Sequence, residues 1–200
     1  FVAAHADRIA VVGLSDPLRD PFGAGGRRTL RLLARSRLRL APYLLASFVL
    51  PMWFGAARRL RAVCAAHGVA CVDLPRVGGF DPARFGAARG VLLHFDQILS
   101  TVDLARFPDG VFNVHPSLLP LHRGPCPTIH AVLEGRGEFG VTVHRVVPEI
   151  DAGAILAQRA VPMAPGVTAV EAARLLHLAA LPLLDDALAG RHRHRALRQD

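Results

Sequence analysis

The chain has 200 residues and a mass of 21.5 kDa, a size that fits one domain. Because 52% of the residues are hydrophobic and 20% are charged, the chain can bury a sizeable core, and disorder over the whole chain is excluded. The three cysteines form no CxxC pair, so neither a disulfide framework nor a cysteine-based zinc site is expected.

The net charge of +8 comes from two short arginine-rich segments. Six arginines lie within 27–39 and four within 191–198, with no acidic residue in either, so the rest of the chain is nearly neutral. Such patches can bind phosphates or nucleic acid, but a solvated helix face and an exposed tail are the simpler interpretation, and we expect no nucleic-acid partner. The apolar stretch 41–57 is shorter than the ~20 residues of a membrane helix, so we expect a cytoplasmic chain without a membrane partner.

Strands and helices alternate along the chain. The first part predicts the end of a helix over 1–7, a strand over 8–13, a loop over 14–26, helices over 29–40 and 56–67, and a strand over 69–73. Further strands are predicted over 90–95, 111–115, 140–144 and 154–161, and the alternation within 140–144 suits a sheet with one solvated side. A capping box at Thr168 and Glu171 begins a last helix, which bends or restarts near Pro182 and ends at Gly190.

This order predicts an α/β fold: an open, Rossmann-like, mostly parallel sheet flanked by helices. We expect one domain over 1–190 and a basic tail over 191–200. Ligands bind such sheets beyond the carboxyl ends of the strands, which directs attention to 97–100, 113–123 and 148–153.

Asn113 and His115 end a predicted strand and, being two residues apart, share one face of it. An amide and an imidazole on one rigid face can stabilise an oxyanion and deliver a proton. Taken alone, however, the pair is more simply two satisfied polar residues at a strand end. Asp151 would orient the imidazole if the fold placed the two side chains together, which spacing alone does not establish.

Four segments in order then resemble a known family: NVHPSLLP at 113–120, RG at 123–124, GVTVH at 140–144 and DAGAILAQ at 151–158. They are similar to the 10-formyltetrahydrofolate-dependent formyltransferases, which include methionyl-tRNA, glycinamide ribonucleotide and amino-sugar N-formyltransferases. The resemblance implies 10-formyltetrahydrofolate as co-substrate, no metal, and catalytic roles for Asn113, for a protonated His115 and for Asp151.

The resemblance also implies two binding regions. The folate side comprises Leu92, Phe95, Gln97, Ile98, Leu99, Pro148, Glu149 and Ile150. The substrate side comprises Ser117, His122, Arg123 and Gly124. We interpret His130 and His144 as structural or surface residues.

The sequence therefore predicts an N-formyltransferase for a small-molecule primary amine, favouring a nucleotide-linked amino sugar. The alternatives are a formyltetrahydrofolate hydrolase, a fragment of a methionyl-tRNA formyltransferase, and an inactive basic binding module. Family members usually begin with a strand before the one at 8–13, so we expect an N-terminally incomplete domain whose sheet lacks its first strand. The apolar residues 43–54 are better explained as core than as an interface, with a homodimer left open.

Overall fold

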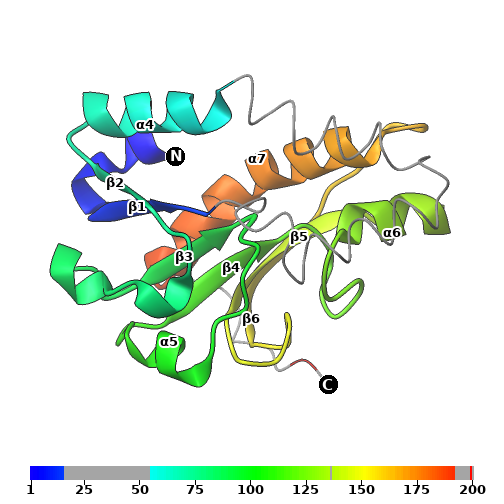
Figure 1. Cartoon of the computed structure of the whole chain (residues 1–200). Helices are drawn as coiled ribbons and strands as arrows, with labels where there is room; N and C mark the ends of the chain where they lie inside the picture. The colour runs from blue at the N-terminus through cyan, green and yellow to red at the C-terminus, as the bar shows by residue number, and fades with distance from the viewer. Residues whose placement is uncertain (16–54, 136, 192–198, 200) are drawn as a thin grey trace, which may run out of the picture. The chain divides into compact units, whose positions relative to one another are not determined.

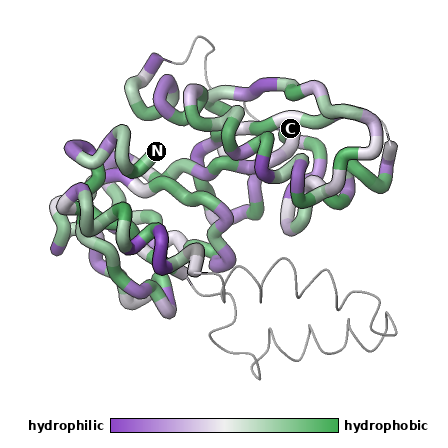
Figure 2. The backbone as a smooth tube through the Cα atoms, turned by 90° about the horizontal axis from the view of Figure 1, so that it is seen from above, coloured by the Kyte–Doolittle hydropathy of each residue, from purple (hydrophilic) through white to green (hydrophobic). Residues whose placement is uncertain are grey.

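The computed structural model describes residues 1–15, 55–135, 137–191 and 199. The predicted helix over 29–40, the basic segment 27–39, and most of the apolar stretch 41–57 and of the basic tail lie outside them. The chain divides into two compact units, Phe1–Phe80 and Asp81–Asp200. Among the described helices, none is both long and apolar enough to cross a membrane, and Figure 2 shows hydrophilic residues interspersed with hydrophobic ones along the chain.

The first unit contains a parallel pair of strands, β1 (Val11–Leu14) and β2 (Ala70–Asp73), and the helix α4 (Ala56–Ala66). These elements confirm the strands predicted over 8–13 and 69–73 and the helix predicted over 56–67. Gly68 follows α4 with φ 67°, a left-handed conformation that glycine adopts at little cost. The residues at the N-terminus form two short 3₁₀ turns, η1 (Val2–Ala4) and η2 (Ala6–Arg8), rather than the end of an α-helix.

The second unit is built on a four-stranded sheet in the order β3 (Gly90–Leu93), β4 (Val111–His115), β5 (Gly140–Arg145) and β6 (Ile155–Ala160) (Figure 1). Strands β3 and β4 are parallel, whereas β5 is antiparallel to both β4 and β6. The helices are α5 (Thr101–Ala105), α6 (Pro127–Glu134) and α7 (Ala169–Leu188). The α/β class and these predicted strands are confirmed; the single incomplete domain over 1–190 stays a prediction.

Helix α7 crosses one face of this sheet (Figure 1). Its buried residues repeat every three or four positions and alternate alanine with leucine: Ala172, Leu176, Ala180, Leu184 and Ala187. The alanines allow close approach to the strands, and the leucines fill the space between them. Pro182 lies on the exposed side, and the helix continues through it, because the missing N–H falls away from the buried stripe.

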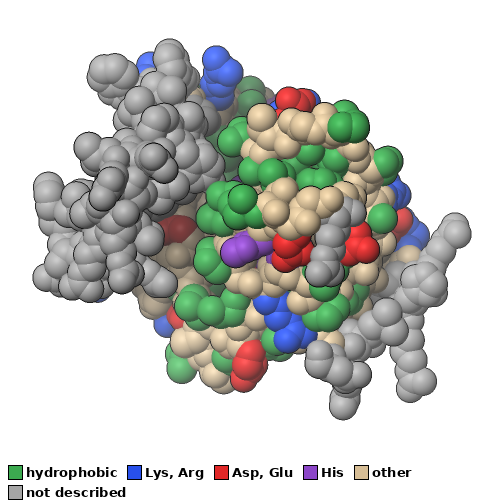
Figure 3. Space-filling view, turned by 90° about the vertical axis from the view of Figure 1, so that its right-hand side faces the viewer, with side chains coloured by type: hydrophobic (Ala, Val, Ile, Leu, Met, Phe, Trp, Pro, Cys, Tyr) green, Lys and Arg blue, Asp and Glu red, His purple; other side chains and the backbone are tan. Residues whose placement is uncertain are grey.

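The prediction that β5 has one solvated side is wrong. All residues from Gly140 to His144 are buried, including the polar Thr142 and His144. The face that carries Thr142 and His144 is covered by two loops: Ser117 and Leu119 of loop 116–124 bond the Thr142 hydroxyl, and Asp151 of loop 146–154 lies beside His144. Elsewhere, large hydrophobic side chains do reach solvent, such as Leu133 on α6 at 78% exposure, and Figure 3 shows others scattered over one face.

Candidate active site

Strand β4 presents Asn113 and His115 on one face of the sheet, as their spacing predicts. The antiparallel pairing with β5 sets His144 opposite Asn113, and Thr142 opposite His115. Directly opposed residues share a face, so four polar side chains gather at this point. The two histidines and the threonine are buried, and the asparagine is half-buried. The site therefore begins as a polar patch on an apolar sheet.

Asp151 reaches this patch from the loop between β5 and β6. A Cβ at Gly153 would overlap the main-chain carbonyl oxygen of Arg145, so glycine is required for the loop to approach β5 this closely. Asp151 itself has a left-handed backbone (φ 49°), which aspartate tolerates better than most residues. The main-chain N–H of Gly124 donates to its Oδ2 at 2.8 Å. These backbone features bring Asp151 beside His115.

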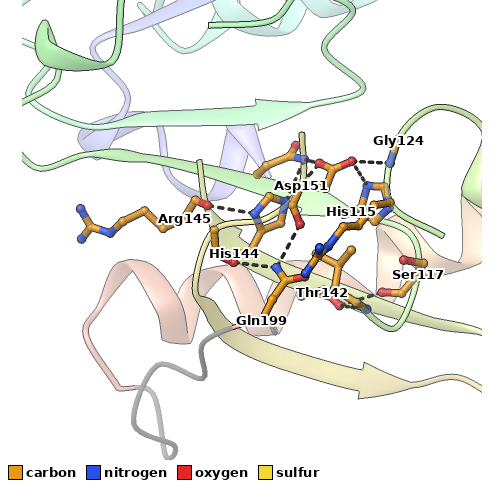
Figure 4. Close-up of polar contacts among 12 residues, drawn as sticks. His115, Ser117, Gly124, Thr142, His144, Arg145, Asp151 and Gln199 are labelled. Atoms are coloured by element: carbon orange, nitrogen blue, oxygen red, sulfur yellow. Dashed lines mark hydrogen bonds and ion pairs between the residues drawn. The ribbon is translucent and has the colours of Figure 1, made fainter. Parts of the chain in front are cut away.

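The Asp151 carboxylate lies between two imidazole rings (Figure 4). Its Oδ2 is 3.4 Å from Nδ1 of His115, and its Oδ1 is 3.4 Å from Nε2 of His144. The side-chain Nδ2 of Asn113 donates to Oδ1 at 3.3 Å. Burial by itself raises the pKa of Asp151, but the His144 ring, the His115 ring and the Gly124 N–H together hold it below 3.8. The carboxylate is therefore ionised at neutral pH.

The tautomer of His115 follows from the contact of Nε2, the ring nitrogen that does not face Asp151. Nε2 lies 2.9 Å from the main-chain carbonyl oxygen of His122, and because a carbonyl can only accept, Nε2 carries a hydrogen. This leaves Nδ1, on the Asp151 side, as the nitrogen that can exchange a proton. Burial lowers the pKa of His115 below 6.5, and the Asp151 carboxylate offsets part of that shift. Burial therefore favours the neutral ring, and the carboxylate favours the protonated one.

Sequence reasoning missed His144 as a member of this site. The side chain is almost fully buried, and its Nδ1 donates to the main-chain carbonyl of Arg145 at 2.9 Å. Its Nε2 lies 3.2 Å from Nδ2 of Asn113. The available signal was its position two residues after Thr142, which puts both on one face of β5. Which face that is, however, follows only from the pairing of β5 with β4.

Comparison with known proteins agrees with this arrangement. The model of the formyl transferase family matches residues 83–187. The chain belongs to the formyl transferase family. The resemblance inferred from the sequence motifs is therefore confirmed.

Two curated formyl transferases and two solved structures show the extent of the similarity. The chain is 50% identical over 76 residues to the methionyl-tRNA formyltransferase of Roseiflexus castenholzii, covering 38% of this chain and 24% of that protein. With the Treponema pallidum (strain Nichols) methionyl-tRNA formyltransferase it shares 43% identity over 104 residues, 52% of this chain and 33% of that protein. The chain thus spans a third or less of these relatives.

The solved structures match more of the chain at lower identity. Glycinamide ribonucleotide transformylase 1 from Symbiobacterium toebii superposes with a TM-score of 0.60 at 25% identity, over 70% of this chain and 74% of that one. A sugar N-formyltransferase from Shewanella sp FDAARGOS_354 superposes with a TM-score of 0.53 at 26% identity, over 65% of this chain and 52% of that one. The Rossmann-like fold of the formyl transferases is therefore shared.

The loop at 116–124 of this formyl transferase is held by a buried polar network. Ser117 Oγ donates to the carbonyl of Leu121 at 2.6 Å, and Thr142 Oγ1 donates to the carbonyl of Ser117 at 2.7 Å. Gln158 Nε2 donates to the carbonyl of Leu119 at 2.9 Å and to Thr142 Oγ1 at 2.8 Å. Ser117 is 4% exposed, so in this structure its hydroxyl supports the loop. Thr142 and Gln158 are supporting residues that the motifs alone did not single out.

The other residues predicted on the substrate side contact different parts of the site and of the Asp151 loop. His122 supplies the carbonyl that orients His115, while the Gly124 N–H is bonded to Asp151. The Arg123 guanidinium donates to the side-chain oxygen of Gln199 at 2.9 and 3.0 Å. The amide nitrogen of Gln199 in turn donates to the main-chain carbonyls of Asp151 (3.0 Å) and Gly153 (2.6 Å).

The residues predicted on the folate side occupy strand β3 and two loops. Leu99 is buried and anchors the loop after β3, whereas Ile98 is 69% exposed. Ile150, in the loop before Asp151, is 53% exposed. The remaining ones are half-buried (Leu92, Phe95 and Gln97) or exposed (Pro148 and Glu149). Each loop thus carries an isoleucine in contact with solvent. In the part of the chain that the structure describes, no group of three or more His, Cys, Asp and Glu side chains is arranged to hold a metal ion.

Proposed function

We propose that this formyl transferase moves the formyl group of 10-formyltetrahydrofolate to a primary amine, with Asn113, His115 and Asp151 at the reacting atoms. The observation that carries the proposal is the ionised Asp151 carboxylate, which contacts an amide donor and an imidazole at once. This arrangement holds a donor and a proton acceptor on the same side of one rigid sheet. Acyl transfer to an amine needs both groups within reach of one carbon atom.

The reaction begins when the lone pair of the neutral amine attacks the formyl carbon. A carbon–nitrogen bond forms, and the carbonyl π electrons move to the formyl oxygen, which becomes an oxyanion. An N–H of Asn113 donates to that oxygen, a contribution of ~2.7–4 kcal/mol in transition-state binding for donors of this kind. The bond from carbon to folate N10 then breaks, leaving the N-formyl product and tetrahydrofolate.

His115 and Asp151 handle the proton that the amine loses. Burial favours the neutral ring of His115, whose Nδ1 can accept this proton as the carbon–nitrogen bond forms. The resulting imidazolium lies 3.4 Å from the Asp151 carboxylate and beside the oxyanion, and both negative charges stabilise it. The proton then passes to N10 of the leaving folate. In this proposal His115 gains its charge during the reaction, whereas the family resemblance implies a ring protonated beforehand.

The two exposed loops support the folate part of the proposal. A pterin ring is flat and apolar on its faces, and the side chains of Ile98 and Ile150 are apolar groups left in water. Binding a ring against them would remove this surface from solvent, at ~25 cal/mol for each Å² buried. Leu99 holds the first loop in place from within the core.

The acceptor we favour is a small amine, with a nucleotide-linked amino sugar first. The VTVHR and DAGAILAQ segments support this choice, as do the solved neighbours, which are named for glycinamide ribonucleotide and for a sugar. A second candidate is an aminoacyl-tRNA, because the curated relatives at 43–50% identity are named methionyl-tRNA formyltransferases.

Release of tetrahydrofolate from 10-formyltetrahydrofolate, measured with and without amines, tests the proposal. The amines are nucleotide-linked amino sugars, glycinamide ribonucleotide and methionyl-tRNA. Release that requires one amine, and that Asn113→Ala, His115→Ala and Asp151→Ala each abolish, is the expected result. His67→Ala, at an exposed position in the first unit, is the control and should retain full activity. Formate release without an amine would indicate a hydrolase, and full activity of His115→Ala would overturn the mechanism.

A further inference from the structure

His144 is a buried histidine with a defined tautomer. The residue is 1% exposed, and its Nδ1 lies 2.9 Å from the carbonyl oxygen of Arg145. A carbonyl can only accept, so Nδ1 carries a hydrogen, and in the neutral ring Nε2 is left as an acceptor. Nε2 faces Nδ2 of Asn113 at 3.2 Å and Oδ1 of Asp151 at 3.4 Å, so the shorter of its two contacts is the one with Asn113.

Three atoms form a nearly equilateral triangle at the centre of the site. Nδ2 of Asn113 lies 3.2 Å from Nε2 of His144 and 3.3 Å from Oδ1 of Asp151, and these two atoms are 3.4 Å apart. Because Oδ1 of the ionised Asp151 can only accept, the amide nitrogen of Asn113, and not its oxygen, faces this pair of atoms. Because the two acceptors subtend a narrow angle at Nδ2, a single N–H of the amide can point between them.

The second N–H of Asn113 therefore points elsewhere. The two N–H bonds of a primary amide diverge by about 120°. With one directed between His144 and Asp151, the other is directed away from both and remains available to a ligand. Without the acceptor at His144, the Asn113 amide would keep Asp151 Oδ1 as its remaining partner. The amide could then rotate about that one contact.

We propose that His144 is a positioning residue, which holds the Asn113 amide so that its second N–H meets the formyl oxygen as negative charge develops. This rests on the proposed function, because the role of Asn113 does. His144 does not itself touch the reacting atoms. It acts through the hydrogen bond that its Nε2 accepts, while the bond from its Nδ1 to Arg145 keeps the ring in the required tautomer.

Two substitutions separate this role from a merely structural one. His144→Gln puts an amide where Nε2 lies, so its oxygen can accept from Asn113 and its NH₂ can donate to Asp151. His144→Asn instead reproduces the Nδ1 donor to the Arg145 carbonyl and leaves no acceptor near Asn113. A structural role predicts that Asn is the better replacement, whereas a positioning role predicts that Gln is.

The experiment compares kcat and KM of the full chain, with the amine that supports turnover, for wild type and both variants. We expect kcat within about fivefold of wild type for His144→Gln and a loss of about 10- to 100-fold for His144→Asn, with both KM values little changed. His67→Asn is the matched control at an exposed histidine. If His144→Asn is as active as His144→Gln, or more so, the inference is overturned.

A second measurement keeps the inference testable where turnover is absent or a variant fails to fold. The imidazole ¹⁵N chemical shifts of wild-type His144 should report hydrogen on Nδ1 and, in the neutral ring, a bare Nε2. An Nε2–H tautomer would overturn the inference. A wild-type chain that turns over no amine, yet shows the Nδ1–H tautomer, would count against the proposed function and not against this arrangement of Asn113.

Discussion

Replacing Asp151 by asparagine removes the charge at the centre of the site and leaves its shape unchanged. The amide oxygen can still accept the Gly124 N–H, which the carboxylate accepts at 2.8 Å. Its NH₂ group then falls where Oδ1 was, 3.3 Å from Nδ2 of Asn113, and sets a donor against a donor. His115, 3.4 Å away through its Nδ1, loses the negative charge that stabilises its protonated form.

The expected loss of rate follows from that distance. Two unit charges 3.4 Å apart attract by about 5 kcal/mol at an effective dielectric constant near 20. The Asp151 side chain is 14% exposed, so solvent screens a part of this, and we expect about 3–4 kcal/mol to be lost from the transition state. That corresponds to a decrease in kcat of roughly 10²- to 10³-fold for Asp151→Asn.

The assay is tetrahydrofolate release at saturating amine and folate, with thermal unfolding measured beside it. Asp109→Asn is the matched control, because it makes the same chemical change at a half-exposed carboxylate on the loop before β4. We expect the control to keep wild-type kcat and both variants to unfold near the wild-type temperature. A kcat for Asp151→Asn within threefold of wild type would refute the electrostatic reasoning.

Three further outcomes follow from the second unit. The NMR titration of His115 should give a pKa below 6.5, because the ring is buried. Asp151→Asn should lower this pKa further, since the carboxylate raises it. An increase in the variant would contradict the contact between Asp151 and His115. Part of the His94 residue reaches solvent, but its ring stacks on His177, and the resulting desolvation, together with the charge of that histidine, lowers the pKa of His94 to about 4. The unfolded chain therefore binds a proton first as the pH falls below 6.5. The free energy of unfolding should therefore fall from pH 6.5 to 4, and less steeply in His94→Gly; equal slopes in urea denaturation would contradict this. Leu176→Ala, at a fully buried position of α7, should lower the free energy of unfolding by ~2–5 kcal/mol. Leu178→Ala, at a residue that is 53% exposed, should change it by less than ~1 kcal/mol. Similar losses in the two variants would contradict the packing of α7.

Much of the fold could be read from local patterns. Gly68 marks the end of α4, and Thr168 begins α7 by accepting from the N–H of Glu171, because these signals depend on a few neighbouring residues. Asn113 and His115 share a face for the same kind of reason, since side chains alternate along any strand. The family resemblance, carried by short ordered motifs, was likewise available from the sequence.

The rest depended on contacts between residues distant in the sequence. His144 looked structural because nothing local distinguishes the two faces of β5, and only the antiparallel register sets it opposite Asn113. The burial of Thr142 follows from a loop more than twenty residues earlier, which bonds its hydroxyl. Asp151 meets both imidazoles because Gly153 lets its loop approach β5. Periodicity assigns residues to faces, but strand direction and loop closure decide which faces meet, and these are properties of the folded chain as a whole.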